Sequence, residues 1–205
     1  MATNNYGICI MIIIFIILIF ALVMISWRTP PVERYFKHWH DANTKILKYK
    51  SEPENFLSKE YTKETKKSNK AMHKLMKYLR KFVVFHLKQN KDIAGKPLIK
   101  DPIELNEAIE RVLATTIQES DDNSTYTINK RDVYLCDPDF INVDKNTVVH
   151  VLLHELAHSA NKTIGHDESW QKIFQDILDH ADKKKIIDQS KPPKLYGYCK
   201  GNYAN

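Results

Sequence analysis

The sequence predicts an α+β fold in which helices predominate, and three observations lead to this. Apolar residues recur every three to four positions over several long stretches, which is the pattern of amphipathic helices. Two short stretches, 125–128 and 133–136, are rich in β-branched and aromatic residues and are separated by a polar turn, so we expect a short β-hairpin or small sheet. Glycine, with five residues among 205, is too scarce for a large β-sandwich.

An apolar run opens the chain. Residues 8–25 carry no charge, and with Ser26 and Trp27 the run reaches the ~20 residues that cross a bilayer. A cleaved signal peptide would begin with basic residues and have a shorter apolar core, whereas residues 1–7 contain no Lys or Arg. The sequence therefore predicts a retained transmembrane helix over 8–27 that anchors the protein in a membrane as a single-pass span.

The charges that flank this run predict the orientation of the chain. Basic residues follow it closely: Arg28, Arg34, Lys37, Lys45, Lys48 and Lys50. By the positive-inside rule, the C-terminal bulk then lies on the cytosolic side. Three cysteines are too few for a disulfide scaffold, which agrees with a reducing compartment. If the protein is viral, the membrane is that of the virion or the host.

A basic helical region is expected next. Pro30 and Pro31 end the predicted span, and helices are predicted over 32–50 and 55–89. The formal net charge of the chain is +6, and basic residues dominate the second of these helices: Lys59, Lys63, Lys66, Lys67, Lys70, Lys74, Lys77, Arg80, Lys81 and Lys88. Contact with anionic lipid or nucleic acid is one interpretation. Because no aromatic residues interleave the basic face, we favour a packing helix with a solvated basic side.

Two further helices frame the C-terminal half. Asp101 and Pro102 are typical of a helix start, and apolar residues continue the helical spacing as far as Ile117. After the metal-binding motif described below, Asp167 is placed to cap a helix over 168–183. Asn146 is the predicted cap of the helix that carries the motif.

The residues His154-Glu155-Leu156-Ala157-His158 carry the strongest chemical signal in the chain. They lie in an apolar stretch without Gly or Pro, which predicts a buried helix, and side chains four positions apart share one helix face. Two such imidazoles can bind one zinc ion, and the Glu after the first His can act as general base. Because two His and a Glu are costly to bury without partners, we interpret them as a metal site.

A third ligand is needed for a catalytic zinc site, and nearby candidates are His150, His166, Asp167 and Glu168. His150 precedes the motif on the same straight helix, and three residues in one line cannot converge on an ion at bond lengths of ~2.0–2.1 Å. Asp167 suits a helix cap and Glu168 the first turn of a helix. His166 is therefore the predicted third ligand, and the fourth position stays open for water.

The motif also carries a family resemblance. HELAH, a short spacer, and then Gly165, His166 and Trp170 resemble the zincin metallopeptidases, especially the SprT-like and WLM groups, although the spacer is longer than in the WLM group. The stretch from 134–136 to 196–199 resembles predicted zinc metallopeptidases of large DNA viruses, so the resemblance covers about residues 125–200. It implies that an edge strand beside the metal-binding helix, for which 133–136 is the candidate, pairs with the substrate backbone. Tyr196 and Tyr198 are candidates for the oxyanion partner.

These observations predict a membrane-anchored, zinc-dependent metallopeptidase that acts on proteins or peptides. His154, His158 and His166 are the predicted Zn²⁺ ligands, and Glu155 is the predicted general base. One alternative is a membrane-tethered structural protein, such as a virion component, with a non-catalytic zinc site, but such a site has no need of Glu155. Another is a basic nucleic-acid-associated protease, as SprT-like proteins are, which the predicted membrane span disfavours.

The predicted organisation of the chain has four parts. They are a short flank over 1–7, the transmembrane anchor over 8–27, a juxtamembrane basic helical region over 28–91, and a zincin-like metallopeptidase domain over 92–205.

Overall fold

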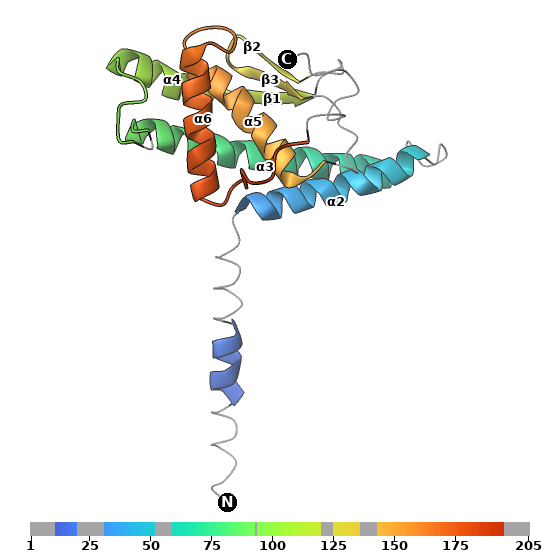
Figure 1. Cartoon of the computed structure of the whole chain (residues 1–205). Coiled ribbons are helices and arrows are strands. Elements are labelled where there is room, and N and C mark those ends of the chain that lie inside the picture. Colours follow the sequence, from blue (N-terminus) through green and yellow to red (C-terminus); the bar gives the residue numbers. More distant parts are fainter. Residues whose placement is uncertain are drawn as a thin grey trace, which may run out of the picture.

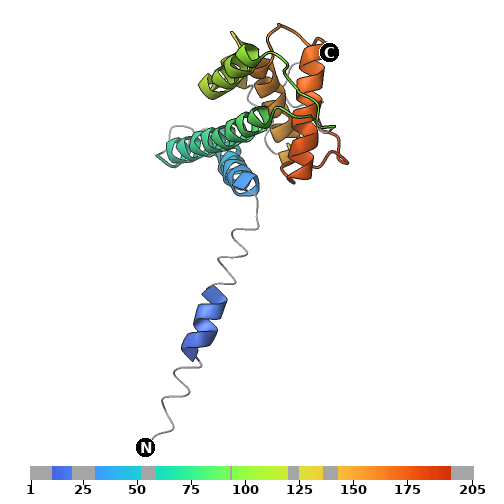
Figure 2. The same ribbon diagram turned by 90° about the vertical axis from the view of Figure 1, so that its left-hand side faces the viewer.

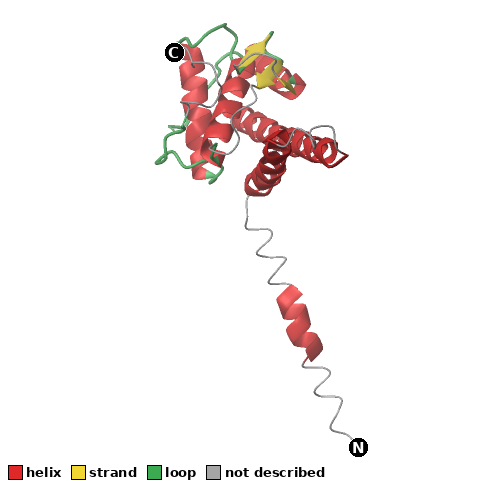
Figure 3. Cartoon of the chain, turned by 90° about the vertical axis from the view of Figure 1, so that its right-hand side faces the viewer, coloured by secondary structure: helices red, strands yellow, loops and turns green. Residues whose placement is uncertain are grey.

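The computed structural model describes residues 11–19, 31–51, 59–92, 94–119, 125–135 and 143–194 (Figure 1). Helices dominate these ranges, and one small sheet lies at one flank of the body (Figure 3). The predicted α+β class with a small sheet is therefore confirmed for the part that the structure describes.

The predicted membrane span is the part of the fold prediction that the structure overturns. None of the helices in the ranges given above is both long and apolar enough to cross a bilayer. Of the predicted span, residues 11–19 form a helix with exposed side chains. The remainder of 8–27 lies outside the described residues. The transmembrane anchor over 8–27 and the single-pass membrane localisation drawn from it are wrong.

Two long helices form a hairpin. α2 (Pro31–Ser51) packs along α3 (Lys59–Gln89), because each has an apolar stripe at helical spacing that needs a partner. The buried residues of α2 include Trp39 and Ile46, and those of α3 include Leu75, Leu79 and Val83. The lysine-rich first half of α3 is also helical, and its Ser68 donates a 2.9 Å hydrogen bond to the side chain of Asn43 on α2.

The sheet has three strands in the order β1-β3-β2. β2 (Tyr126–Ile128) pairs antiparallel with β3 (Asp132–Leu135), which confirms the predicted hairpin. β1 (Thr116–Glu119) pairs parallel with β3 and was not predicted. The sequence analysis assigned Ile117 to the preceding helix because it continues the helical spacing of the apolar residues. That helix, α4 (Pro102–Ala114), ends earlier, at the β-branched run that begins with Thr115.

β3 is the central strand of this sheet, so the prediction that 133–136 forms the substrate-pairing edge strand is wrong. The family resemblance suggested this strand, whereas β1 pairs with one of its edges and β2 with the other. The edge strand that contacts the helix with the HELAH motif is β2.

The central element of the fold is α5 (Lys145–Ala160), which carries the HELAH motif. It contacts α3, α4, β2 and α6 (Glu168–Lys183), and Figure 2 shows α6 and the α2–α3 hairpin on either side of it. Leu152, Leu153 and Leu156 are fully buried in the common core. The helix cap is Asp144, which accepts a hydrogen bond from the amide of Thr147, and not the predicted Asn146.

Candidate metal centre

Three histidines converge on one point between α5 and the loop that follows it. His154 and His158 lie one turn apart on α5, and their Nε2 atoms are 3.1 Å apart. The Nε2 atom of His166 is also 3.1 Å from that of His154. The three ligand atoms lie within 4.8 Å of one another and could hold a metal ion, so all three predicted ligands are gathered at one site.

The loop between α5 and α6 delivers His166. α5 ends at Ala160 with Asn161 as its cap, and Gly165 takes a left-handed conformation with φ of 91° directly before His166. Asp167 then caps α6, as predicted, by accepting a 2.8 Å hydrogen bond from the amide of Trp170. The same carboxylate accepts from the hydroxyl of Thr163, so the loop is closed on itself.

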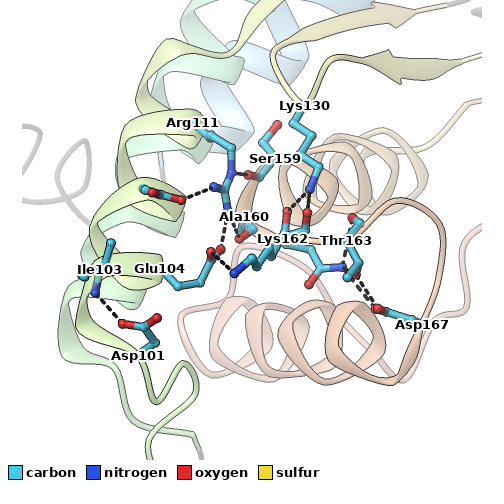
Figure 4. Close-up of polar contacts among 12 residues, drawn as sticks. Asp101, Ile103, Glu104, Arg111, Lys130, Ser159, Ala160, Lys162, Thr163 and Asp167 are labelled. Atoms are coloured by element: carbon cyan, nitrogen blue, oxygen red, sulfur yellow. Dashed lines mark hydrogen bonds and ion pairs between the residues drawn. The ribbon is translucent and has the colours of Figure 1, made fainter.

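Two cationic side chains hold the C-terminal end of α5 and the start of this loop (Figure 4). Arg111 donates to the carbonyl of Ser159 at 3.0 Å and to that of Ala160 at 3.2 Å. Lys130, from the turn of the β2–β3 hairpin, donates to the carbonyl of Asn161 at 2.8 Å and to that of Lys162. The carbonyls of Ser159 and Ala160 are among those that a helix end leaves without intrahelical partners, and positive charge at this end is favourable to the helix dipole.

Trp170 forms an aromatic wall behind the three imidazoles. Its ring lies 4.7 Å from His154 and 4.3 Å from His166 between centroids, and it stacks on His158 at 5.0 Å. Phe174, one turn further along α6, stacks on Trp170 at 4.8 Å. The indole of Trp170 thus contacts all three imidazoles.

Glu155 lies beside the site on α5 and is almost fully buried, with 2% of its surface exposed. The hydroxyl of Thr127 on β2 donates a hydrogen bond to its carboxylate. Burial raises the pKa of Glu155 from 4.5 to about 7, and the Thr127 hydrogen bond opposes this increase. A carboxyl group with such a pKa can both accept and return a proton near neutral pH.

The motif histidines are held in the neutral form that binds metals. Burial, and then the neighbouring His158 and His166, lower the pKa of His154 to about 3. Burial, followed by His166 and Lys130, lowers the pKa of His158 to about 4. Both imidazoles are therefore unprotonated at neutral pH, and their nitrogen lone pairs are available to an ion.

The donor set fits zinc. Two nitrogens that each lie ~2.0–2.1 Å from one ion in tetrahedral geometry are roughly 3.3 Å apart, close to the 3.1 Å between the Nε2 atoms here. Three imidazoles are also the ligand set of known catalytic zinc sites, in which the fourth position is open.

The remaining described residues singled out from the sequence as candidate ligands are not part of this group. His150 is not among the converging ligands and packs its ring edge-on against Phe174 at 5.2 Å, as expected for a residue outside the coordination sphere. Tyr196 and Tyr198, the candidates for the oxyanion partner, lie outside the described residues.

The structure adds Thr127, Arg111 and Lys130, which the sequence analysis did not assign to the site. Of these three residues, only Lys130 could have been found from the sequence. It lies in the predicted hairpin turn, and a turn between two strands can project a side chain toward a neighbouring loop.

Comparison with known proteins finds two viral relatives. Over 82 residues the chain is 40% identical to Uncharacterized protein 042R of Invertebrate iridescent virus 3, a match that covers 38% of this chain and 51% of that protein. Over 80 residues it is 36% identical to Uncharacterized protein 136R of Invertebrate iridescent virus 6, and this match covers 37% of this chain and 44% of that protein. The chain thus spans about half the length of these relatives. It matches no protein-family profile and no solved structure.

Proposed function

We propose that this chain is a zinc-dependent metallopeptidase that hydrolyses peptide bonds in a protein or peptide substrate. The observation that carries the proposal is the convergence of three imidazoles next to a buried carboxylate whose pKa is raised to about 7. A structural zinc site has no use for such a carboxylate, which destabilises the fold when it is ionised. The alternative of a non-catalytic zinc site in a structural protein is weaker for this reason.

The roles of the residues follow from their positions. His154, His158 and His166 would hold the ion, which when bound supplies Lewis acidity at the scissile carbonyl and acidifies a water molecule. Glu155 accepts the proton of the attacking water and passes it to the leaving amine. The Thr127 hydroxyl orients the Glu155 carboxylate. The substrate backbone would lie beside β2, the edge strand that contacts α5.

The substitution Glu155→Gln tests the proposal. Gln keeps the size of the side chain and a hydrogen bond to Thr127 but cannot take up the proton. We expect the zinc content of the full chain to stay unchanged while cleavage of a peptide library falls by about 10²- to 10⁴-fold, the usual contribution of general-base catalysis.

The matched control is Glu168→Gln, which changes an exposed carboxylate in the first turn of α6. This variant should cleave as the wild type does. If Glu155→Gln retains activity within about tenfold of the wild type, or if the zinc-loaded wild type cleaves no peptide of the library, the proposal is wrong.

A further inference from the structure

A second group of metal-ligating side chains lies away from the HELAH motif, where α3 meets α6. The Nε2 atom of His86 on α3 is 2.5 Å from Oδ2 of Asp176 on α6. His180, one turn after Asp176, has its ring centroid 4.0 Å from that of His86, and its Nδ1 atom is 3.8 Å from the same Oδ2. One ligand atom from each residue lies within 4.8 Å of the other two.

The sequence gives this group the same local geometry as the first site. Asp176 and His180 are four positions apart on α6, so their side chains share a face, as His154 and His158 do on α5. The third residue comes from a distant segment, 90 positions earlier. His86 interrupts the apolar stripe of α3 and is 2% exposed, while Asp176 is 5% exposed. Two polar side chains thus occupy positions where the fold would otherwise bury hydrocarbon.

The chemistry of the group suits a cation. A buried carboxylate is costly unless opposite charge or hydrogen bonds compensate it, and two imidazoles lie on Asp176. Nδ1 of His180 lies 2.9 Å from the backbone carbonyl of Asp176, which can only accept, so Nδ1 carries the proton and Nε2 the lone pair. Metal-binding histidines are commonly oriented by such a hydrogen bond from the other ring nitrogen.

We propose that His86, Asp176 and His180 form a second site for a divalent transition metal ion of the zinc class. Two imidazoles and one carboxylate are ligands that such ions take, and at least one position is left to water. The ion joins α3 to α6, two helices that otherwise make few contacts. Since α6 also carries Trp170 and Phe174, the second ion stabilises the support of the first site and has a structural role. This inference does not depend on peptidase activity.

Zinc stoichiometry of the full chain tests this proposal. The protein is freed of metal with a chelator and dialysed against Zn²⁺. Its bound zinc is then measured by inductively coupled plasma mass spectrometry. We expect about two equivalents for the wild type and about one for His180→Gln and for Asp176→Asn. His180 is partly exposed, so its variant is the one more certain to fold, and circular dichroism checks both. His166→Gln, which removes a ligand of the first site, should also bind about one equivalent.

The matched control is His73→Gln, an exposed histidine on α3 that should leave the stoichiometry at two. A second readout uses His166→Gln, in which Zn²⁺ should raise the thermal midpoint through the second site, and this rise should vanish in His166→Gln/His180→Gln. The proposal is overturned if His180→Gln binds as much zinc as the wild type, or if His166→Gln binds none. If the wild type binds only one equivalent of zinc, and His180→Gln loses it while His166→Gln keeps it, the second site is supported and the first site is not.

Discussion

Glu155 shows how burial at a single residue prepares a chemical group. Its neighbours on α5 are core leucines, and the surrounding hydrocarbon disfavours the ionised carboxylate, so its pKa rises to about 7. Thr127 acts in the opposite direction because its hydroxyl donates to the carboxylate. The balance between these two effects sets the pH at which Glu155 becomes a base.

Removal of the hydroxyl by Thr127→Val should therefore raise the pKa of Glu155 further. If Glu155 is the general base, the acid limb of the pH profile of kcat/KM moves to higher pH, since more of the enzyme is protonated at a given pH. The profile is measured on the zinc-loaded protein. Thr116→Val is the control, because Thr116 bonds to Asp132 on the exposed face of the sheet and should leave the limb in place. An acid limb that is unmoved or moves to lower pH would contradict the role of Thr127.

At the scale of elements, α6 supports the site and does not supply its predicted ligands. Asp167 fixes the start of the helix, and this places Trp170 in the first turn against the three imidazoles. Phe174 continues the aromatic wall one turn later. The position of His166 therefore depends on the packing of the helix that follows it.

Truncation of the wall should be costly for both stability and metal binding. Trp170 is 6% exposed, and replacement of a buried Trp by Ala typically lowers the free energy of unfolding by about 3–5 kcal/mol. We expect Trp170→Ala to lose stability on this scale in urea denaturation and to bind zinc more weakly. Trp170→Phe keeps an aromatic ring and removes an indole N–H that has no hydrogen-bond partner within the described residues, so it should lose much less. Equal losses in the two variants would show that the wall has no such role.

At the scale of the whole molecule, buried histidines make the metal-free protein sensitive to acid. The pKa values of His86, His150, His154 and His158 are all lowered, in each case by burial first. The unfolded chain, with histidine pKa values near 6.5, then binds more protons than the folded one below that pH. The stabilising free energy is therefore fully present above about pH 6.5. It falls as the pH decreases toward about 4 and about 3, the pKa values of His158 and His154 in the folded protein.

Urea midpoints of the metal-free protein should accordingly be lower at pH 5 than at pH 7.5. Glu155 acts in the opposite sense, because its raised pKa stabilises the folded state at low pH and this contribution is lost as the pH rises from 4.5 to about 7. Because four histidines destabilise the folded state on acidification and one carboxyl group stabilises it, we expect a net loss of stability. In Glu155→Gln the loss between pH 7.5 and pH 5 should be steeper than in the wild type. A midpoint that rises on acidification would refute this assignment of buried neutral histidines.

Features that depend on neighbours within one or two turns could be predicted from the sequence. The pairing of His154 with His158, the Asp167 cap, the β2–β3 hairpin and the helical periods all follow from spacings of two to four residues. Such spacings map directly onto a helix face or a strand pair, because the geometry of those elements is regular. His166, predicted as third ligand because the straight helix excluded His150 by distance, lies with His154 and His158 in one group, and its role as a ligand stays a prediction.

Contacts between distant segments could not be predicted from the sequence. The parallel pairing of β1 with β3, the Thr127 bond to Glu155, the Lys130 contact with the loop and the His86–Asp176 pair join residues that lie 16 to 90 positions apart. The membrane span was inferred from composition alone, and the described helix at 11–19 does not bear it out. Local pattern carries no information on these points, because the free energy that selects one long-range contact over another comes from the packing of the whole core around α5.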